Sequence, residues 1–117
     1  MKQSQAEILS LSLNSMMNEK GSVGLKIMRN KRMIDEELKE YYQFKNELFQ
    51  KYADGKDFIE PNTEKGQEYL KEFQPIADME VDFDFKKITE EELANSNLTA
   101  NQMAVIWEWM VNDKSEL

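Results

Sequence analysis

The side chains of this chain that could do chemistry are mainly carboxylates, because the sequence contains no cysteine and no histidine. Thiol nucleophiles, imidazole bases and Cys/His zinc sites are therefore excluded. The most regular acids are Glu80, Asp82 and Asp84, which alternate with apolar residues across 79–85. In this arrangement they could bind a hard cation such as Mg²⁺ or carry out acid–base chemistry. We favour the interpretation that these acids form the solvated face of a strand. A cation or acid–base site would need a cleft and side chains from several elements, and an alternating pattern supplies neither.

A second acidic group, Glu90, Glu91 and Glu92, follows Thr89, where carboxylates would stabilise the positive end of a short helix. Other catalytic patterns are missing from the sequence. The stretch Gly21-Ser22-Val23-Gly24 lacks the lysine and the preceding strand of a phosphate-binding loop, and no serine–lysine spacing stands out. We therefore expect no enzyme activity, no catalytic residue, no cofactor and no metal ion.

Charge is unevenly distributed along the chain. The net charge is −8, yet residues 20–34 contain five bases and no acid, whereas residues 54–117 contain sixteen acids and six bases. The acidic majority argues against direct binding to nucleic acid, whose usual partner surface is basic. The basic cluster includes Lys26, Arg29 and Arg32, which could contact a partner, clamp acids of the same chain, or form a solvated helix face.

The length of 117 residues and the mass of 13.8 kDa fit a single domain over residues 1–117. The longest apolar run is four residues, Ala104 to Trp107, so no membrane segment is expected. The N-terminus lacks the basic-then-apolar pattern of a secretory signal, and together with the absence of cysteine this predicts a cytoplasmic protein.

The strongest helical pattern runs from about residue 23 to about residue 52. About thirty residues of helix would be roughly 45 Å long, which exceeds the width of a domain of this size. One end should therefore project or pack against something else, and a second copy of the chain could cover it. The apolar stripe of this helix consists of Ile27, Ile34, Leu38, Tyr41, Phe44, Leu48 and Tyr52.

The other predicted elements are shorter. A first helix covers about 4–19, with Ser4 and Glu7 at capping-box spacing. The remaining predictions are a strand at 57–60, a helix at 64–73 that Thr63 caps and Pro75 limits, a strand at 79–85, a short helix at 89–94, and a helix at 100–112 with Thr99 and Gln102 as a capping box. We expect an α+β fold in which the two strands form a small antiparallel hairpin; an all-α fold with an extended arm is the alternative.

The last helix contains two tryptophans that cannot share one face. Trp107 fits the buried stripe with Met103 and Met110, whereas Trp109 lies about 160° around the helix from Trp107. Exposed tryptophan is enriched at protein interfaces, so Trp109 is a candidate contact for a partner. Packing of Trp109 against another local element is the alternative.

The order of these patterns resembles a family of small proteins of unknown function encoded by bacteriophages and prophages of Gram-positive bacteria. The resemblance covers about residues 5–112, and the family supplies no active residues to carry over. It implies a phage accessory protein that acts in a bacterial cytoplasm. The strings that carry it are Lys26-Ile27-Met28-Arg29-Asn30-Lys31, 34–38 with Tyr41, Lys51-Tyr52-Ala53, 70–73, 79–83 with Ile88, and Leu98-Thr99.

Two functions follow as expectations. The first is an inhibitor or modulator of a host or defence enzyme, similar to an anti-CRISPR protein, whose acids enter a basic groove that otherwise holds nucleic acid. The second is a phage assembly factor that self-associates through its long helix. The predicted contact residues are Glu80, Asp82, Asp84, Glu90, Glu91 and Glu92 on the acidic face, with Trp109, Lys26, Arg29 and Arg32 elsewhere.

Overall fold

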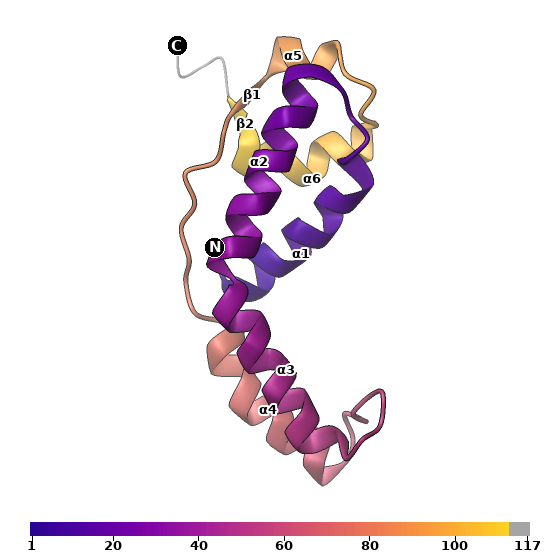
Figure 1. Ribbon diagram of the computed structural model, residues 1–117, viewed down its shortest axis with the longest axis vertical. Helices are drawn as coiled ribbons and strands as arrows, with labels where there is room; N and C mark the ends of the chain where they lie inside the picture. Colours follow the sequence, from indigo (N-terminus) through magenta and orange to yellow (C-terminus); the bar gives the residue numbers. More distant parts are fainter. Residues whose placement is uncertain (113–117) are drawn as a thin grey trace.

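The computed structural model describes residues 1–112 and shows a mainly helical protein with a body and a projecting arm (Figure 1). Residues 113–117 of the predicted domain lie outside the described residues. The molecule measures 51 × 26 × 23 Å, and its radius of gyration is 17.2 Å. A compact chain of this length would have a radius of gyration of about 13 Å. The arm accounts for this elongation. The body contains α1 (Gln3–Leu13), the 3-10 turn η1 (Asn14–Met16), α2 (Gly21–Glu37), α5 (Glu90–Ala94) and α6 (Ala100–Met110), and the arm contains α3 (Lys39–Ala53) and α4 (Glu64–Ala77).

The predicted long helix is present but is divided into α2 and α3 at Leu38. Hydrogen bonds continue across the division, from the Leu38 amide to the Ile34 carbonyl and from the Tyr42 amide to the Leu38 carbonyl, each at 2.9 Å. The apolar stripe is also continuous, but α1 covers its first half and α4 covers its second half. A bend at the junction lets one stripe meet two helices that lie in different directions. As expected from its length, one end of the long helix projects from the body (Figure 1).

The arm is stabilised by aromatic side chains between its two helices. Tyr41, Phe73, Tyr69 and Tyr52 follow one another along the arm, with successive ring centroids 6.0, 5.5 and 6.4 Å apart. At the root, Glu7 of α1 accepts hydrogen bonds from the Tyr41 hydroxyl at 2.9 Å and from Lys45 Nζ at 2.6 Å. Burial and the nearby carboxylate raise the pKa of Tyr41 above its ordinary value. The stripe of α3 therefore has its partner, α4, within the same chain.

The predicted antiparallel hairpin is absent from the described residues. Residues 57–60 lie in the loop at the far end of the arm, whereas 79–85 run along the body, because α4 carries the chain back between them (Figure 1). Strand pairing consists of a two-residue parallel pair, β1 (Ile88–Thr89) with β2 (Val111–Asn112), and of an antiparallel bridge between Lys2 and Glu80. The helical part of the expected fold is confirmed, and the hairpin is not.

The residues predicted to begin and end the helices are confirmed in part. Thr63 and Thr99 cap α4 and α6 as predicted, with hydrogen bonds from Gly66 N and Gln102 N. Ser4 does not cap α1, which begins one residue earlier because the Lys2 amide donates to Gln5 Oε1. Pro75 does not limit α4 as predicted, since the helix continues to Ala77.

The body has one apolar core, to which every helix of the body contributes. Its fully buried members include Leu13, Ile27, Ile34, Leu38, Ile88, Leu93, Ile106 and Met110. Asn30 lies among them with 0% of its surface exposed. Its Nδ2 donates to the Lys86 carbonyl at 3.0 Å, and its Oδ1 accepts from the Lys86 amide at 2.7 Å. Asn30 therefore pairs with the extended segment after α4 as a neighbouring strand would.

The substitution Asn30→Ala should destabilise the fold, because it leaves both backbone groups of Lys86 without partners and opens a small cavity. We expect the free energy of unfolding, measured with urea, to fall by about 2 kcal/mol or more. Asn46→Ala is the matched control, since Asn46 is an exposed asparagine within α3. Equal effects of the two substitutions would contradict the role given to Asn30.

Candidate functional site

The candidate site is a row of carboxylates on the extended segment 79–87, which runs beside the body. Glu80, Asp82 and Asp84 are exposed, whereas Phe83 and Phe85 turn inward, their rings stacked at 5.2 Å between centroids. The alternation predicted for residues 79–85 is therefore present over 80–85 but fails at Met79, which is 55% exposed, and no strand pairs with most of this segment in the described structure. Successive carboxylates in an extended chain lie roughly 6.6 Å apart. We call Glu80, Asp82 and Asp84 the acidic edge.

The segment that carries the acidic edge is held at both ends. Asn30 binds the backbone of Lys86 at one end. At the other end, the Val81 amide donates to the Met1 carbonyl at 2.8 Å, and the Gln3 amide donates to the Met79 carbonyl at 2.9 Å. The carboxylates therefore project from a fixed backbone, which lowers the entropy cost of binding a partner.

Two of the three carboxylates form no ion pair with another group among residues 1–112. Glu80 lies 3.2 Å from the amino group of Met1, yet its side chain is 72% exposed. Within residues 1–112, Asp82 and Asp84 form no ion pair. Lys87, close to them in sequence, donates instead to the Trp109 carbonyl at 2.9 Å. The acidic edge therefore keeps negative charge that the rest of the described chain does not neutralise.

Of the two tryptophans of α6, Trp107 departs from its prediction, whereas Trp109 follows the alternative in which it packs within the chain. Trp107 is 46% exposed, and Trp109 is partly buried against the core. The reason is that the extended segment covers the side of α6 that carries Trp109, so that Trp109 and Asp82 line one shallow hollow with Glu108. Glu108 was not among the predicted residues, because nothing in the sequence indicates that α6 and the segment lie together.

Glu92 and Lys26 were predicted to contact a partner, but they contact each other. For Lys26 this is the alternative in which the basic cluster clamps acids of the same chain. Lys26 Nζ donates to Glu92 Oε1 at 2.7 Å, and the Ser22 hydroxyl donates to Glu92 Oε2 at 2.5 Å. The Thr89 amide also donates to Glu92 at 3.0 Å. These bonds, with the one from Lys26 as the largest cause, lower the pKa of Glu92 to about 2. The carboxylate lies at the beginning of α2, where the positive end of the helix dipole favours a negative charge.

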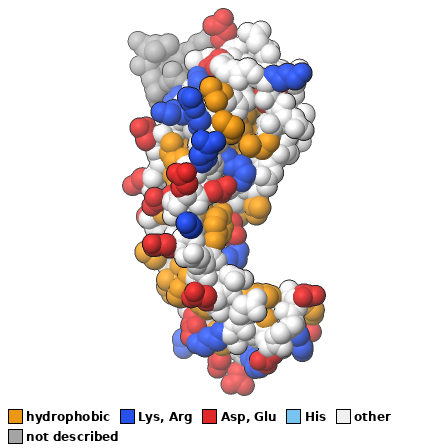
Figure 2. Space-filling model, in the orientation of Figure 1, with side chains coloured by type: hydrophobic (Ala, Val, Ile, Leu, Met, Phe, Trp, Pro, Cys, Tyr) orange, Lys and Arg blue, Asp and Glu red, His pale blue; other side chains and the backbone are white. Residues whose placement is uncertain are grey.

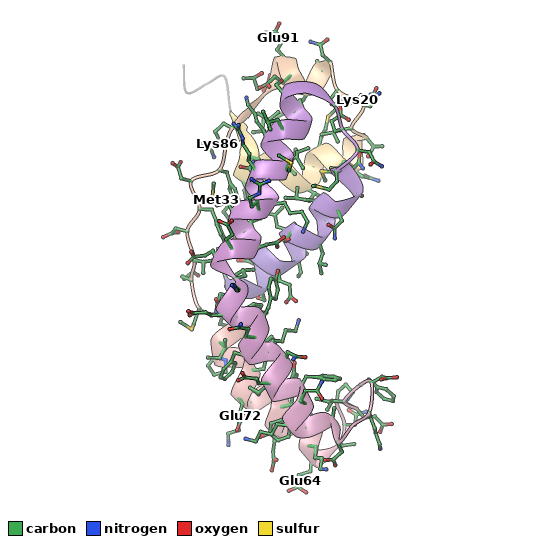
Figure 3. All side chains as sticks on the ribbon, in the orientation of Figure 1. Lys20, Met33, Glu64, Glu72, Lys86 and Glu91 are labelled. Carbon is green, nitrogen blue, oxygen red and sulfur yellow. The ribbon has the colours of Figure 1, made fainter. Side chains whose placement is uncertain are left out.

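The other predicted residues are dispersed. Glu91 is exposed at the end of the body farthest from the arm, as Figure 3 shows, and Glu90 beside it is half-buried. Arg29 and Arg32 are exposed on α2 and form no ion pair within the described residues. Lys86 lies beside α2 and adds to this basic surface (Figure 3). Lys86 lies only two positions from Asp84, so this basic surface adjoins one end of the acidic edge.

One further polar cluster was not expected from the sequence. Lys31 Nζ donates to Ser10 Oγ at 2.9 Å, and Ser10 Oγ donates to Asp35 Oδ1 at 2.5 Å. Lys31 Nζ also lies 3.0 Å from Asp35 Oδ2. The Ser10 hydroxyl is thus held by both partners of an ion pair, and Ser10 is only 2% exposed. This cluster ties α1 to α2.

Comparison of the chain with protein-family models, with curated proteins and with solved structures finds no match. Within residues 1–112, no helix combines the length and the apolar character that crossing a membrane requires. In the same part of the chain, acidic side chains nowhere gather in threes or more in a way that could hold a metal ion. The acidic edge is thus a row of separate charges.

The pairing of Glu92 with Lys26 predicts a pH dependence of stability. The pKa of Glu92 is about 2 in the folded protein, below its ordinary value of 4.5. Its stabilising effect should therefore be complete above pH 4.5 and should be lost as the pH falls towards 2. In urea unfolding, wild type should be more stable than Glu92→Gln at neutral pH, and the difference should shrink on acidification.

Glu91→Gln is the control for this experiment, because Glu91 is the exposed neighbour on the same short helix. It should change stability little at any pH. A difference between wild type and Glu92→Gln that stays constant down to pH 2 would show that the ion pair is not the source.

Proposed function

We propose that the protein is a non-enzymatic binding protein whose acidic edge enters a basic groove of a nucleic-acid enzyme. The observation that carries this proposal is the pair Asp82 and Asp84, which are exposed, unpaired within residues 1–112 and mounted on a fixed backbone. Regularly spaced negative charges on an extended chain resemble those of a nucleic-acid strand in sign and repetition. A groove that accepts phosphates could therefore accept the acidic edge.

The proposed action is inhibition or modulation by occupancy. A protein seated in such a groove would exclude nucleic acid without making or breaking a bond. Charge complementarity would speed association and make binding weaken with salt. The resemblance to phage and prophage proteins suggests that the target is a host or defence enzyme in a bacterial cytoplasm, as for anti-CRISPR proteins.

The second candidate, an assembly factor that self-associates through its long helix, has less support. Its basis was an apolar stripe without a partner. α4 packs along the stripe of α3, and the member of that stripe that stays exposed is Phe44, at 41%. Self-association through other surfaces is a separate question.

A binding experiment with matched variants tests the proposal. The edge variant carries Glu80→Gln, Asp82→Asn and Asp84→Asn. The control variant carries Glu40→Gln, Glu47→Gln and Glu68→Gln, which remove the same charge from exposed positions of the arm. Each protein is immobilised and exposed to bacterial lysate at low salt. Retained proteins are identified by mass spectrometry and challenged with single-stranded DNA.

We expect wild type and the control variant to retain a nucleic-acid enzyme that the edge variant retains about tenfold less, because the lost charges lie at the contact. Single-stranded DNA and high salt should release that enzyme. Equal retention by the edge variant, or a bound enzyme that DNA does not displace, would mean that the acidic edge is only solvated surface.

A further inference from the structure

The far end of the arm presents an aromatic side chain beside acidic residues. Phe58 lies in the loop between α3 and α4 and is 61% exposed. It borders an apolar recess with Phe49 and Leu70. Figure 2 shows apolar and acidic side chains together at this end of the molecule. Exposed aromatic residues are enriched where proteins bind one another.

The loop that carries Phe58 has a defined shape. The Thr63 hydroxyl donates to the Glu60 carbonyl at 2.8 Å, and Thr63 also caps α4. Gly66 lies against the loop, and a Cβ at this position would collide with the Glu60 carbonyl oxygen. A loop fixed in this way presents Phe58 with little conformational freedom left to lose on binding.

The charges around Phe58 are mainly negative. Residues 54–65 contain four acids and two bases, and one of these bases, Lys65, pairs with Asp54. Asp57 and Glu60 are exposed, and neither carboxylate forms an ion pair within the described chain. We call Asp57, Phe58 and Glu60 the arm tip, which is an apolar knob with negative charge on both sides.

A shallow groove on the body has complementary features. Met17 and Met28 supply most of its apolar lining, and Arg32 and Lys39 lie at its border. The other charged residues there are Lys31 and Asp35, which pair with each other, and Glu36. Arg29 and Leu25 continue this surface along α2, where Figure 2 shows basic side chains beside apolar ones. We call Met17, Met28, Arg32 and Lys39 the methionine groove.

We propose that the arm tip of one molecule docks into the methionine groove of a second copy of the chain. Phe58 would fill the groove, since flexible methionine side chains adapt to an inserted ring. Asp57 and Glu60 would approach Arg32, Lys39 and Arg29. Within one molecule the tip cannot reach the groove, because the arm points away from the body along the 51 Å axis (Figure 1).

The arm tip fits the groove better than the acidic edge does. The groove lining is largely apolar, and the edge turns Phe83 and Phe85 inward, so that it offers mainly carboxylates. The tip combines an exposed aromatic ring with acids that are unpaired within residues 1–112. A contact between different surfaces of identical chains is head-to-tail, and such contacts build rings or open chains. This proposal concerns residues outside the acidic edge and is independent of the proposed function.

Complementary variants test the proposal in solution. The tip variant carries Asp57→Lys and Phe58→Ser, and the groove variant carries Met28→Gln and Arg32→Glu. Mass is measured by sedimentation from about 10 µM to about 1 mM, the range in which small interfaces associate. The mass of wild type should rise with concentration from 13.8 kDa, whereas each variant alone should remain at 13.8 kDa. A mixture of the two variants should form a dimer and nothing larger, because one intact tip and one intact groove remain.

The control variant carries Leu11→Ser and Glu47→Lys, which make a similar change at exposed positions outside both surfaces. It should associate as wild type does, and so should the edge variant, which keeps this test separate from that of the proposed function. Circular dichroism confirms that each variant is folded. A wild type that remains monomeric throughout, or a mixture that forms no dimer, overturns the proposal.

Discussion

The side chain of Asn30 supplies a donor and an acceptor to the backbone of Lys86, and the position of residues 79–87 depends on this pair of hydrogen bonds. An extended segment without a neighbouring strand has no regular partners for its amides, and buried amides without partners are costly. The Asn30 side chain accepts a hydrogen bond from the Lys86 amide at one end of the segment. The Met1 carbonyl accepts one from the Val81 amide at the other end. The rings of Phe83 and Phe85 then hold the middle of the segment against the body.

The fixed segment determines the direction of its own carboxylates, and the other charges of the molecule lie on the helices and on the arm. The period-two pattern places Asp82 and Asp84 outward even though these residues join no sheet in the described structure. Glu92, by contrast, accepts hydrogen bonds from Lys26 and Ser22 at the beginning of α2. Arg29 and Arg32 remain exposed on α2, and the arm carries Asp57 and Glu60 to the opposite end of the molecule. The acids of the arm tip and the bases of α2 are thus kept apart within one chain, which suits contacts between molecules.

The sequence predicts the local features of this structure and few of the contacts between distant residues. The stripe of the long helix, the caps at Thr63 and Thr99, and the alternation over 80–85 are visible because each depends on neighbouring residues. The contacts of Asn30 with Lys86, of Glu7 with Lys45 and of Lys26 with Glu92 join residues 56, 38 and 66 positions apart, which no local pattern reports. The same reason explains the wrong predictions. The hairpin prediction is wrong because α4 carries the two predicted strands apart. Which of Trp107 and Trp109 is buried depends on the extended segment, which covers one side of α6.

Hydrogen exchange of single amides by NMR tests most directly whether the extended segment is clamped to the body as described. The amides of Val81 and Lys86 each donate a hydrogen bond, and we expect both to exchange slowly. Within the described residues, the amides of Asp82 and Asp84 donate none, so they should exchange fast on the same segment. Exchange of the Lys86 amide at the rate of its neighbours Asp82 and Asp84 would contradict the account, because the acidic edge would then have no fixed backbone.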